Sequence, residues 1–175
     1  MSLDKKVKPK INILFVCSGN TCRSPMAERI FAAYCKGKRC PYKPIVKSAG
    51  LYANDGDPMT SQAVDVLGLL GIDSSTPHQA KLLTVDVLQN ADIIVCMTEG
   101  IKQQLLMSRS YEYASSDLKT RLVGCVKELT GEDVPDPYGR GLEAYGETAR
   151  ALTKMCQPLF EIMISFGDKN KSFLL

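Results

Sequence analysis

Hydrophobic positions along the chain fall into two patterns, which predict strands and helices. Short, mainly apolar runs such as Ile11–Val16 and Ile93–Cys96 are typical of strands buried on both faces of a parallel sheet. Apolar residues that recur every three or four positions, as in Glu143–Ser165, are typical of a helix with one buried face. The patterns predict strands at Ile11–Val16, Ile45–Ser48, Ile93–Cys96 and Thr120–Val123, and helices at Pro25–Lys36, Thr60–Leu70, Thr84–Gln89, Glu99–Met107 and Glu143–Ser165.

Strands and helices alternate along the chain, and this order predicts an α/β fold. Alternating units place the strands parallel in one twisted sheet, and right-handed crossovers put helices on both faces. We therefore expect three layers built around a four-stranded parallel sheet. Ligands of such sheets bind beyond the carboxyl ends of the strands, where the strand order switches. The loop that begins at Cys17, directly after the first strand, lies at such an end.

The length of 175 residues suits one domain with a substantial core. No internal repeat, low-complexity tract or interdomain linker interrupts the pattern. We expect a single domain at 11–167, preceded by a basic extension at 1–10 and followed by a tail at 168–175.

Composition and charge narrow the class of protein. The 45% hydrophobic and 23% charged content is ordinary for a globular protein, and a net charge of +3 is too small to indicate a nucleic-acid partner. No apolar run approaches the ~20 residues that span a bilayer. The basic first residues lack the apolar stretch of a signal peptide. We expect a cytoplasmic protein with no membrane partner.

The seven cysteines form an odd set without a secretory signal, so a disulfide framework is not expected. Two pairs share a four-residue gap, which raises the alternative of a zinc site: Cys17/Cys22 and Cys35/Cys40. The first pair, however, lies in a loop with another explanation, and we expect no metal and no cofactor. The remaining cysteines lie in apolar surroundings and are predicted to be buried: Cys96, Cys125 and Cys156.

The segment from Cys17 to Arg23 carries the most specific chemistry in the chain. A tight loop between a strand and a helix can point successive backbone N–H groups at an anion, and the helix N-terminus adds positive potential. The same field stabilises a thiolate at Cys17, while the planar guanidinium of Arg23 can bind two phosphoryl oxygens. A thiolate that faces a tetrahedral anion is the chemistry of a cysteine-dependent phosphatase, with a phosphate loop after the first strand.

A second segment offers the proton that such a reaction needs. Leaving groups such as phenoxide and neutral guanidine depart poorly unless they are protonated. Asp136 lies between Pro135 and Pro137, which restrict the backbone of a loop that could present one carboxylate to the anion site. Taken alone, the segment also fits an ordinary turn.

The two segments together resemble the low-molecular-weight protein tyrosine phosphatase family. The resemblance runs from about Ile11 to the final helix, and the family's motifs occur in its order and spacing: Cys17–Arg23, Ser24-Pro25, Ser48-Ala49-Gly50, Cys96-Met97 and Asp136-Pro137. It implies that Cys17 is the nucleophile, Arg23 binds the phosphoryl group, and Asp136 is the general acid and then the base that activates water. The residues implied to surround the substrate are Ser18, Gly19, Asn20, Thr21, Cys22, Ser24 and Tyr138.

The resemblance also implies roles around the loop. Asn20 is expected in a left-handed backbone conformation, which Asn tolerates better than most residues. In the family this Asn is held by a serine and a histidine, which match Ser48 and His78, the only histidine of the chain. Cys22 matches a cysteine that forms a reversible disulfide with the nucleophile and so protects it from over-oxidation. The alternative is that Cys22 only fills space behind the loop.

Thr21 bears on which phosphorylated side chain is the substrate. Tyrosine phosphatases of this family often carry an aliphatic residue there, and Thr21 resembles the protein-arginine phosphatase branch. A hydroxyl can bond a polar guanidino group and slightly penalises an apolar ring. Met97-Thr98 and the single aromatic Tyr138 after Asp136-Pro137 favour the same branch. We expect a monomer that acts on phosphoarginine in proteins.

Three alternatives stay open. Phosphotyrosine is the main one, because Tyr138 would suit a flat phenol. Arsenate reductases share the fold but need a further pair of redox cysteines, and Cys96 has no cysteine in the following dozen residues. A noncatalytic phosphate-binding module would be expected to lack Cys17 or Asp136, and both are present.

Overall fold

A computed structural model describes residues 7–115 and 122–170. The elements in chain order are β1 (Lys10–Cys17), α1 (Arg23–Lys36), β2 (Lys43–Gly50), α2 (Ser61–Leu69), α3 (Val85–Gln89), β3 (Ile93–Cys96), α4 (Glu99–Leu106), α5 (Arg109–Ser115), β4 (Leu122–Cys125), α6 (Val126–Thr130) and α7 (Leu142–Lys169). Within the described residues, no helix is both long enough and apolar enough to cross a membrane.

The four strands form one parallel sheet in the order β2-β1-β3-β4, which confirms the predicted fold class. The two central strands, β1 and β3, are the ones that the sequence identifies by their apolar runs. β1 pairs with β2 over its whole length, from Lys10 beside Lys43 to Cys17 beside Gly50. The order switches at β1, because β2 lies on one side of it and β3 on the other, and the predicted loop starts there.

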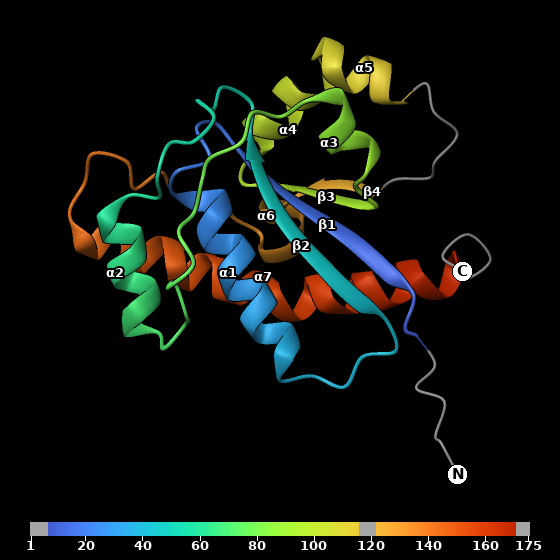
Figure 1. Ribbon diagram of the computed structural model, residues 1–175, viewed down its shortest axis with the longest axis horizontal. Coiled ribbons are helices and arrows are strands. Elements are labelled where there is room, and N and C mark those ends of the chain that lie inside the picture. The colour runs from blue at the N-terminus through green and yellow to red at the C-terminus, as the bar shows by residue number, and fades with distance from the viewer. Residues whose placement is uncertain (1–6, 116–121, 171–175) are drawn as a thin grey trace.

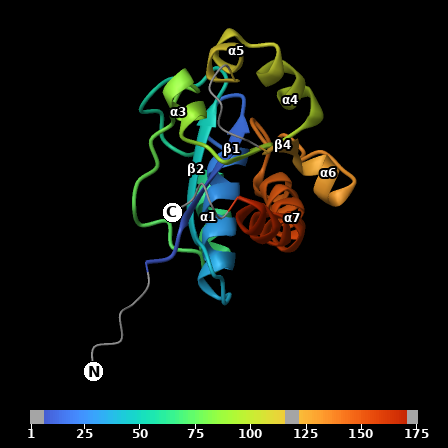
Figure 2. The same cartoon turned by 90° about the vertical axis from the view of Figure 1, so that its right-hand side faces the viewer.

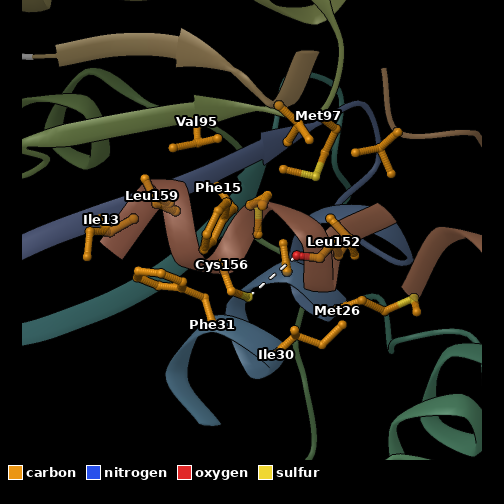
Figure 3. Close-up of a cluster of buried hydrophobic side chains, with 14 of the residues drawn as sticks. Ile13, Phe15, Met26, Ile30, Phe31, Val95, Met97, Leu152, Cys156 and Leu159 are labelled. Carbon is orange, nitrogen blue, oxygen red and sulfur yellow. Dashed lines mark hydrogen bonds between the residues drawn. The ribbon is translucent and has the colours of Figure 1, made fainter. Parts of the chain in front are cut away.

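Alternate residues of β1 enter two separate cores, as the two-residue period of a strand requires. Ile13 and Phe15 pack in a cluster with α1, α2 and α7, and Figure 3 shows them against Phe31, Cys156 and Leu159. Leu14 and Val16 point the other way, into a cluster with α3, α4 and α5. Helices therefore cover both faces of the sheet, as the turned view in Figure 2 shows.

The element boundaries differ from the predicted ones where tertiary contacts decide them. β2 was predicted at Ile45–Ser48 but extends over Lys43–Gly50, because pairing with β1 continues through the less apolar positions. β4 was predicted at Thr120–Val123, but it continues to Cys125, while Thr120 lies outside the described residues. α7 runs to Lys169, past the predicted end at Ser165, so the first two positions of the predicted 168–175 tail are helical.

Two short helices, α5 and α6, were not predicted. Their seven and five residues are too few to show a clear periodicity. α6 follows β4 without a connecting loop and starts at a capping box, in which the backbone N–H of Cys125 donates to Glu128 Oε2 at 2.8 Å. This capping depends on the side chain of Glu128 turning back to the end of β4, which the hydrophobic pattern does not reveal.

Candidate active site

A cavity of about 600 Å³ opens at the carboxyl end of β1. Its floor is the loop between β1 and α1, its rim carries Tyr52 and Tyr138, and a segment before α2 forms a wall. The residues that line it are Cys17, Ser18, Gly19, Asn20, Thr21, Cys22, Arg23, Tyr52, Asn54, Asp57, Pro58, Met59, Thr60, Ser61, Asp136 and Tyr138. The cavity thus brings together the two segments singled out in the sequence.

The thiol of Cys17 lies at the base of this cavity and is 3% exposed. Its Sγ accepts a hydrogen bond from the backbone N–H of Asn20 at 3.2 Å and lies 2.9 Å from Ser24 Oγ. Ser24 Oγ in turn accepts a hydrogen bond from Asn20 Nδ2 at 2.8 Å, and of the two acceptors within reach of its proton, Cys17 Sγ at 2.9 Å is nearer than the Ala49 carbonyl oxygen at 3.4 Å. The Asn20 N–H and the Ser24 hydroxyl therefore both lie within hydrogen-bond distance of the sulfur.

Asn20 has every polar group satisfied although it is fully buried. Its amide Nδ2 donates to Ser24 Oγ and to Ser48 Oγ at 2.8 and 2.9 Å, and its Oδ1 accepts from the Lys81 N–H at 2.9 Å. His78 Nε2 lies 2.8 Å from the carbonyl oxygen of Asn20, so this nitrogen carries the proton. The φ of Asn20 is 55°, in the left-handed region. The contacts from Ser48 and His78 hold this backbone conformation in place.

Two further close approaches fix the position of β2 relative to α1 and to the loop. Ser48 Oγ donates to Glu28 Oε2 at 2.6 Å, which links the end of β2 to α1. Gly50 lies so close to the loop that a Cβ there would be 2.5 Å from the carbonyl oxygen of Ser18 and 2.9 Å from the backbone nitrogen of Asn20. Only glycine lets β2 approach the loop this closely.

Arg23 and Asp136 meet at the mouth of the site. Arg23 Nη2 donates to Asp136 Oδ2 at 2.6 Å, and their side chains are 9% and 55% exposed. The other oxygen of Asp136 accepts from the Tyr138 N–H at 3.2 Å. Two contacts anchor the loop that carries Asp136: the Val134 N–H donates to the Met97 carbonyl at 3.1 Å, and Thr148 Oγ1 donates to the Pro135 carbonyl at 3.2 Å. The loop is thus fixed to β3 and α7.

Cys22 lies beside the phosphate loop in polar surroundings. Its Sγ is 3.4 Å from the Tyr145 hydroxyl, 3.6 Å from Thr60 Oγ1 and 3.7 Å from Thr21 Oγ1. Burial raises the pKa of Tyr145 to about 12, and the hydrogen bond with Cys22 is the second cause of this rise. The phenol therefore stays protonated at neutral pH. The Cys22 sulfur therefore has three hydroxyl groups near it and does not pack against apolar side chains alone.

The remaining cysteines are all buried. Burial is the main reason that the pKa values of Cys35, Cys96 and Cys156 rise to about 12, which keeps these thiols neutral. Among residues 7–115 and 122–170, the group of metal-ligand types close enough to share an ion is Glu99, Cys125 and Glu128, and it includes neither predicted cysteine pair. Within this group Cys125 donates to Glu99, and Glu128 pairs with Lys102.

The predicted site residues therefore fall into two sets. Most line the cavity, whereas Ser24, Ser48 and His78 lie behind the loop and reach it through Cys17 or Asn20. Sequence reasoning missed Tyr145 and the wall and rim residues Tyr52, Asn54, Asp57, Pro58, Met59, Thr60 and Ser61. Most of these lie in an irregular segment between β2 and α2, where no periodicity or motif marks a side chain that faces the site.

Comparisons with known proteins agree with this geometry. The family model for "Low molecular weight phosphotyrosine protein phosphatase" matches residues 12–168. A protein-arginine-phosphatase of Bacillus subtilis is 34% identical over 152 residues, which cover 85% of this chain and 94% of that protein. The crystal structure of a low molecular weight protein tyrosine phosphatase from T. tengcongensis is 43% identical, with a TM-score of 0.71 and coverage of 87% of this chain and 99% of that one.

A second similar structure is a mutant of the YwlE arginine phosphatase with a phosphorylated active-site serine. It is 30% identical, has a TM-score of 0.74, and covers 87% of this chain and 95% of its own. The match of the family model over most of the sequence, together with these relatives, shows that this chain belongs to the low molecular weight phosphotyrosine protein phosphatase family.

Proposed function

We propose that this phosphatase hydrolyses phosphorylated protein side chains through a phosphocysteine at Cys17. The observation that carries the proposal is the position of Cys17 Sγ, which meets two hydrogen-bond donors at the base of a cavity that also contains Arg23 and Asp136. A thiolate with such donors is an activated nucleophile that needs no adjacent base. The phosphorylated serine in the YwlE mutant supports transfer to the equivalent kind of loop.

In the first step the Cys17 thiolate attacks phosphorus. The S–P bond forms while the bond from phosphorus to the leaving nitrogen or oxygen breaks, and Asp136 gives that leaving atom its proton. Backbone N–H groups of the loop and the Arg23 guanidinium bind the phosphoryl oxygens, whose negative charge they stabilise.

The ion pair between Arg23 and Asp136 must open for this step. The carboxylate of Asp136 is paired with one nitrogen of the guanidinium at 2.6 Å. A bound phosphoryl group offers Arg23 two oxygens instead, so the guanidinium can exchange the carboxylate for the phosphoryl group. Substrate binding thus releases the carboxyl group.

In the second step water attacks the phosphocysteine. Asp136, now ionised, accepts a proton from that water, the P–O bond forms, the S–P bond breaks, and inorganic phosphate leaves. The Cys17 thiolate is restored, and the donors from Asn20 and Ser24 stabilise it as the leaving group.

Cys22 is proposed to protect Cys17 under oxidising conditions. A sulfenic acid on Cys17 would condense with the Cys22 thiol to give a disulfide and water, which thiols can reverse. The hydroxyls of Thr21, Thr60 and Tyr145 support this, because they give the Cys22 sulfur polar neighbours beside the loop that carries Cys17.

Phosphoarginine in proteins is the substrate that we favour. Thr21 lines the cavity next to Cys22, and its hydroxyl offers a polar partner to a guanidino group. The protein-arginine-phosphatase of Bacillus subtilis supports this choice, while the similarity to a tyrosine phosphatase from T. tengcongensis keeps phosphotyrosine as the second candidate.

Two phosphopeptides of matched sequence, one with phosphoarginine and one with phosphotyrosine, test the substrate. We expect the wild type to have the higher kcat/KM on phosphoarginine. Thr21→Ile should move the ratio toward phosphotyrosine by roughly 10- to 200-fold, the usual effect of one hydroxyl or methyl in a pocket. Thr153→Val, which changes a hydroxyl on α7 that bonds the Ala149 carbonyl, is the matched control. A wild-type preference for phosphotyrosine that Thr21→Ile leaves unchanged would reject phosphoarginine.

A further inference from the structure

The cavity extends well past the phosphate loop, along a wall formed by residues 57–61. Backbone hydrogen bonds fix this wall at two points. The Thr60 N–H donates to the Thr21 carbonyl at 3.0 Å, and the Ala80 N–H donates to the Asp57 carbonyl at 2.8 Å. The wall therefore stands at a set position opposite the loop, and it places one carboxylate, Asp57, in the cavity.

Asp57 and Asp136 are the two carboxylates that line the cavity, and they differ in their partners. Asp136 is paired with Arg23 at 2.6 Å. The half-buried Asp57 accepts from Asn54 Nδ2 at 3.3 Å, and no ion pair reaches it from the part of the chain that the structure describes. Asp57 thus keeps acceptor capacity and a negative charge for a group that enters the cavity.

The two candidate substrates present different chemistry to this carboxylate. A phosphorylated guanidino group carries further N–H donors beyond the phosphoryl group, and it becomes a guanidinium cation as it leaves with the proton from Asp136. A planar set of N–H donors matches a carboxylate in shape and charge. A phenol ring offers neither donors nor positive charge.

We propose that Asp57 is a specificity-determining residue that binds the guanidino N–H groups of a phosphoarginine substrate. The inference rests on the proposed function and deepens it, because it names the group that selects the side chain. Asp136 then supplies the proton, Arg23 binds the phosphoryl oxygens, and Asp57 holds the far side of the guanidino group. Thr21 and Asp57 both line the cavity, Thr21 from the loop and Asp57 from the wall.

The test is Asp57→Asn, measured as kcat/KM on the two matched phosphopeptides. Hydrogen bonds to charged groups contribute about 1.5–3 kcal/mol, so phosphoarginine turnover should fall roughly 10- to 100-fold. Phosphotyrosine turnover should change less than about threefold, because that ring gains nothing from the carboxylate. Asp55→Asn is the matched control, since Asp55 lies two residues away outside the lining, and Asn keeps the oxygen that accepts from the Leu82 N–H at 2.7 Å. It should leave both rates unchanged.

Two outcomes would overturn the inference: an equal loss on both substrates, which would make Asp57 a structural residue, or no loss on either substrate. Calorimetric binding of the phosphoarginine peptide to Cys17→Ala protein, which has no nucleophile to accept the phosphoryl group, separates this question from turnover. Asp57→Asn in that background should weaken binding of the phosphoarginine peptide but not of the phosphotyrosine peptide. A wild type that turns over neither peptide would reject the proposed function, and the binding comparison would still decide the role of Asp57.

Discussion

The phosphate loop and the hydrophobic core each bury a cysteine, and the two cysteines have opposite surroundings. Cys17 is 3% exposed and Cys156 is 1% exposed. Cys17 Sγ meets a backbone N–H and a hydroxyl, whereas Cys156 packs among apolar side chains and donates only to the Leu152 carbonyl of its own helix at 3.5 Å (Figure 3). Burial raises the pKa of Cys156 to about 12. Burial alone makes a thiol inert, and donors directed at sulfur make it a nucleophile.

The two regions also hold their shape by different means. The core is held by packing, with Phe15 and Phe31 in edge-to-face contact at 5.9 Å between ring centroids. The loop is held by hydrogen bonds between Asn20 and three residues far from it in the sequence, Ser48, His78 and Lys81. Substitutions in the loop should therefore reduce activity more than stability, and those in the core should do the reverse.

The largest expected effect is that of Cys17→Ser. Turnover should fall at least a thousandfold, because a serine hydroxyl is a weaker nucleophile than a thiolate and the oxygen of a phosphoserine is a poorer leaving group than the sulfur of a phosphocysteine. Cys156→Ala should keep wild-type turnover and lose about 1–2 kcal/mol of stability, as small core truncations do. Steady-state kinetics and urea unfolding of both variants measure this contrast. More than about a tenth of wild-type activity in Cys17→Ser would contradict the covalent mechanism.

The next largest effect is expected for Gly50→Ala. The new Cβ would lie 2.5 Å from the Ser18 carbonyl oxygen, so the loop must shift and its donors move off Cys17. A displacement near 1 Å at a catalytic site costs about 100-fold in kcat/KM. Gly68→Ala on α2 is the control, because a Cβ there meets no atom within 4 Å. Equal activity of the two variants would show that the close approach of β2 does not position the loop.

Cys156 should contribute to the pH dependence of the free energy of unfolding. Its thiol has a pKa of about 12 in the folded protein but an ordinary value when unfolded, so above pH 9 the unfolded chain has lost a proton that the folded one keeps. The free energy of unfolding is therefore constant with respect to this thiol below pH 9. It falls as the pH rises further, by about 1.4 kcal/mol per pH unit for one thiol. Urea unfolding from pH 9 to 11 should show a slope shallower by this amount in Cys156→Ala. Parallel slopes would mean that Cys156 is not protonated in the fold.

The smallest effect is expected for Cys22→Ser. The Cys22 sulfur is buried, as that of Cys156 is, but it has polar neighbours, as that of Cys17 has. Peroxide should inactivate the wild type reversibly, and thiol treatment should restore a larger fraction of activity in the wild type than in Cys22→Ser. Mass spectrometry should find a Cys17–Cys22 disulfide in the oxidised wild type. Detection of sulfinic or sulfonic acid on Cys17 alone would argue against the pairing.

Several features of this protein were determined by local sequence. The apolar runs at Ile11–Val16 and Ile93–Cys96 identified the two central strands, because a strand buried on both faces has no room for polar positions. The alternation of strands and helices predicted the parallel sheet, and the Cys17–Arg23 segment predicted where the site lies. Each of these signals is contained within a few neighbouring residues.

Other features were decided only by the tertiary structure. The pairing of Asp136 with Arg23, the contact of Tyr145 with Cys22 and the wall that carries Asp57 join residues from separate elements, and side-chain direction in irregular segments leaves no period in the sequence. The ends of β2 likewise depended on its neighbour β1, because strand pairing continues wherever a partner backbone is available. The sequence contains the reacting groups, and the packed fold determines which of them share the surroundings that make them reactive.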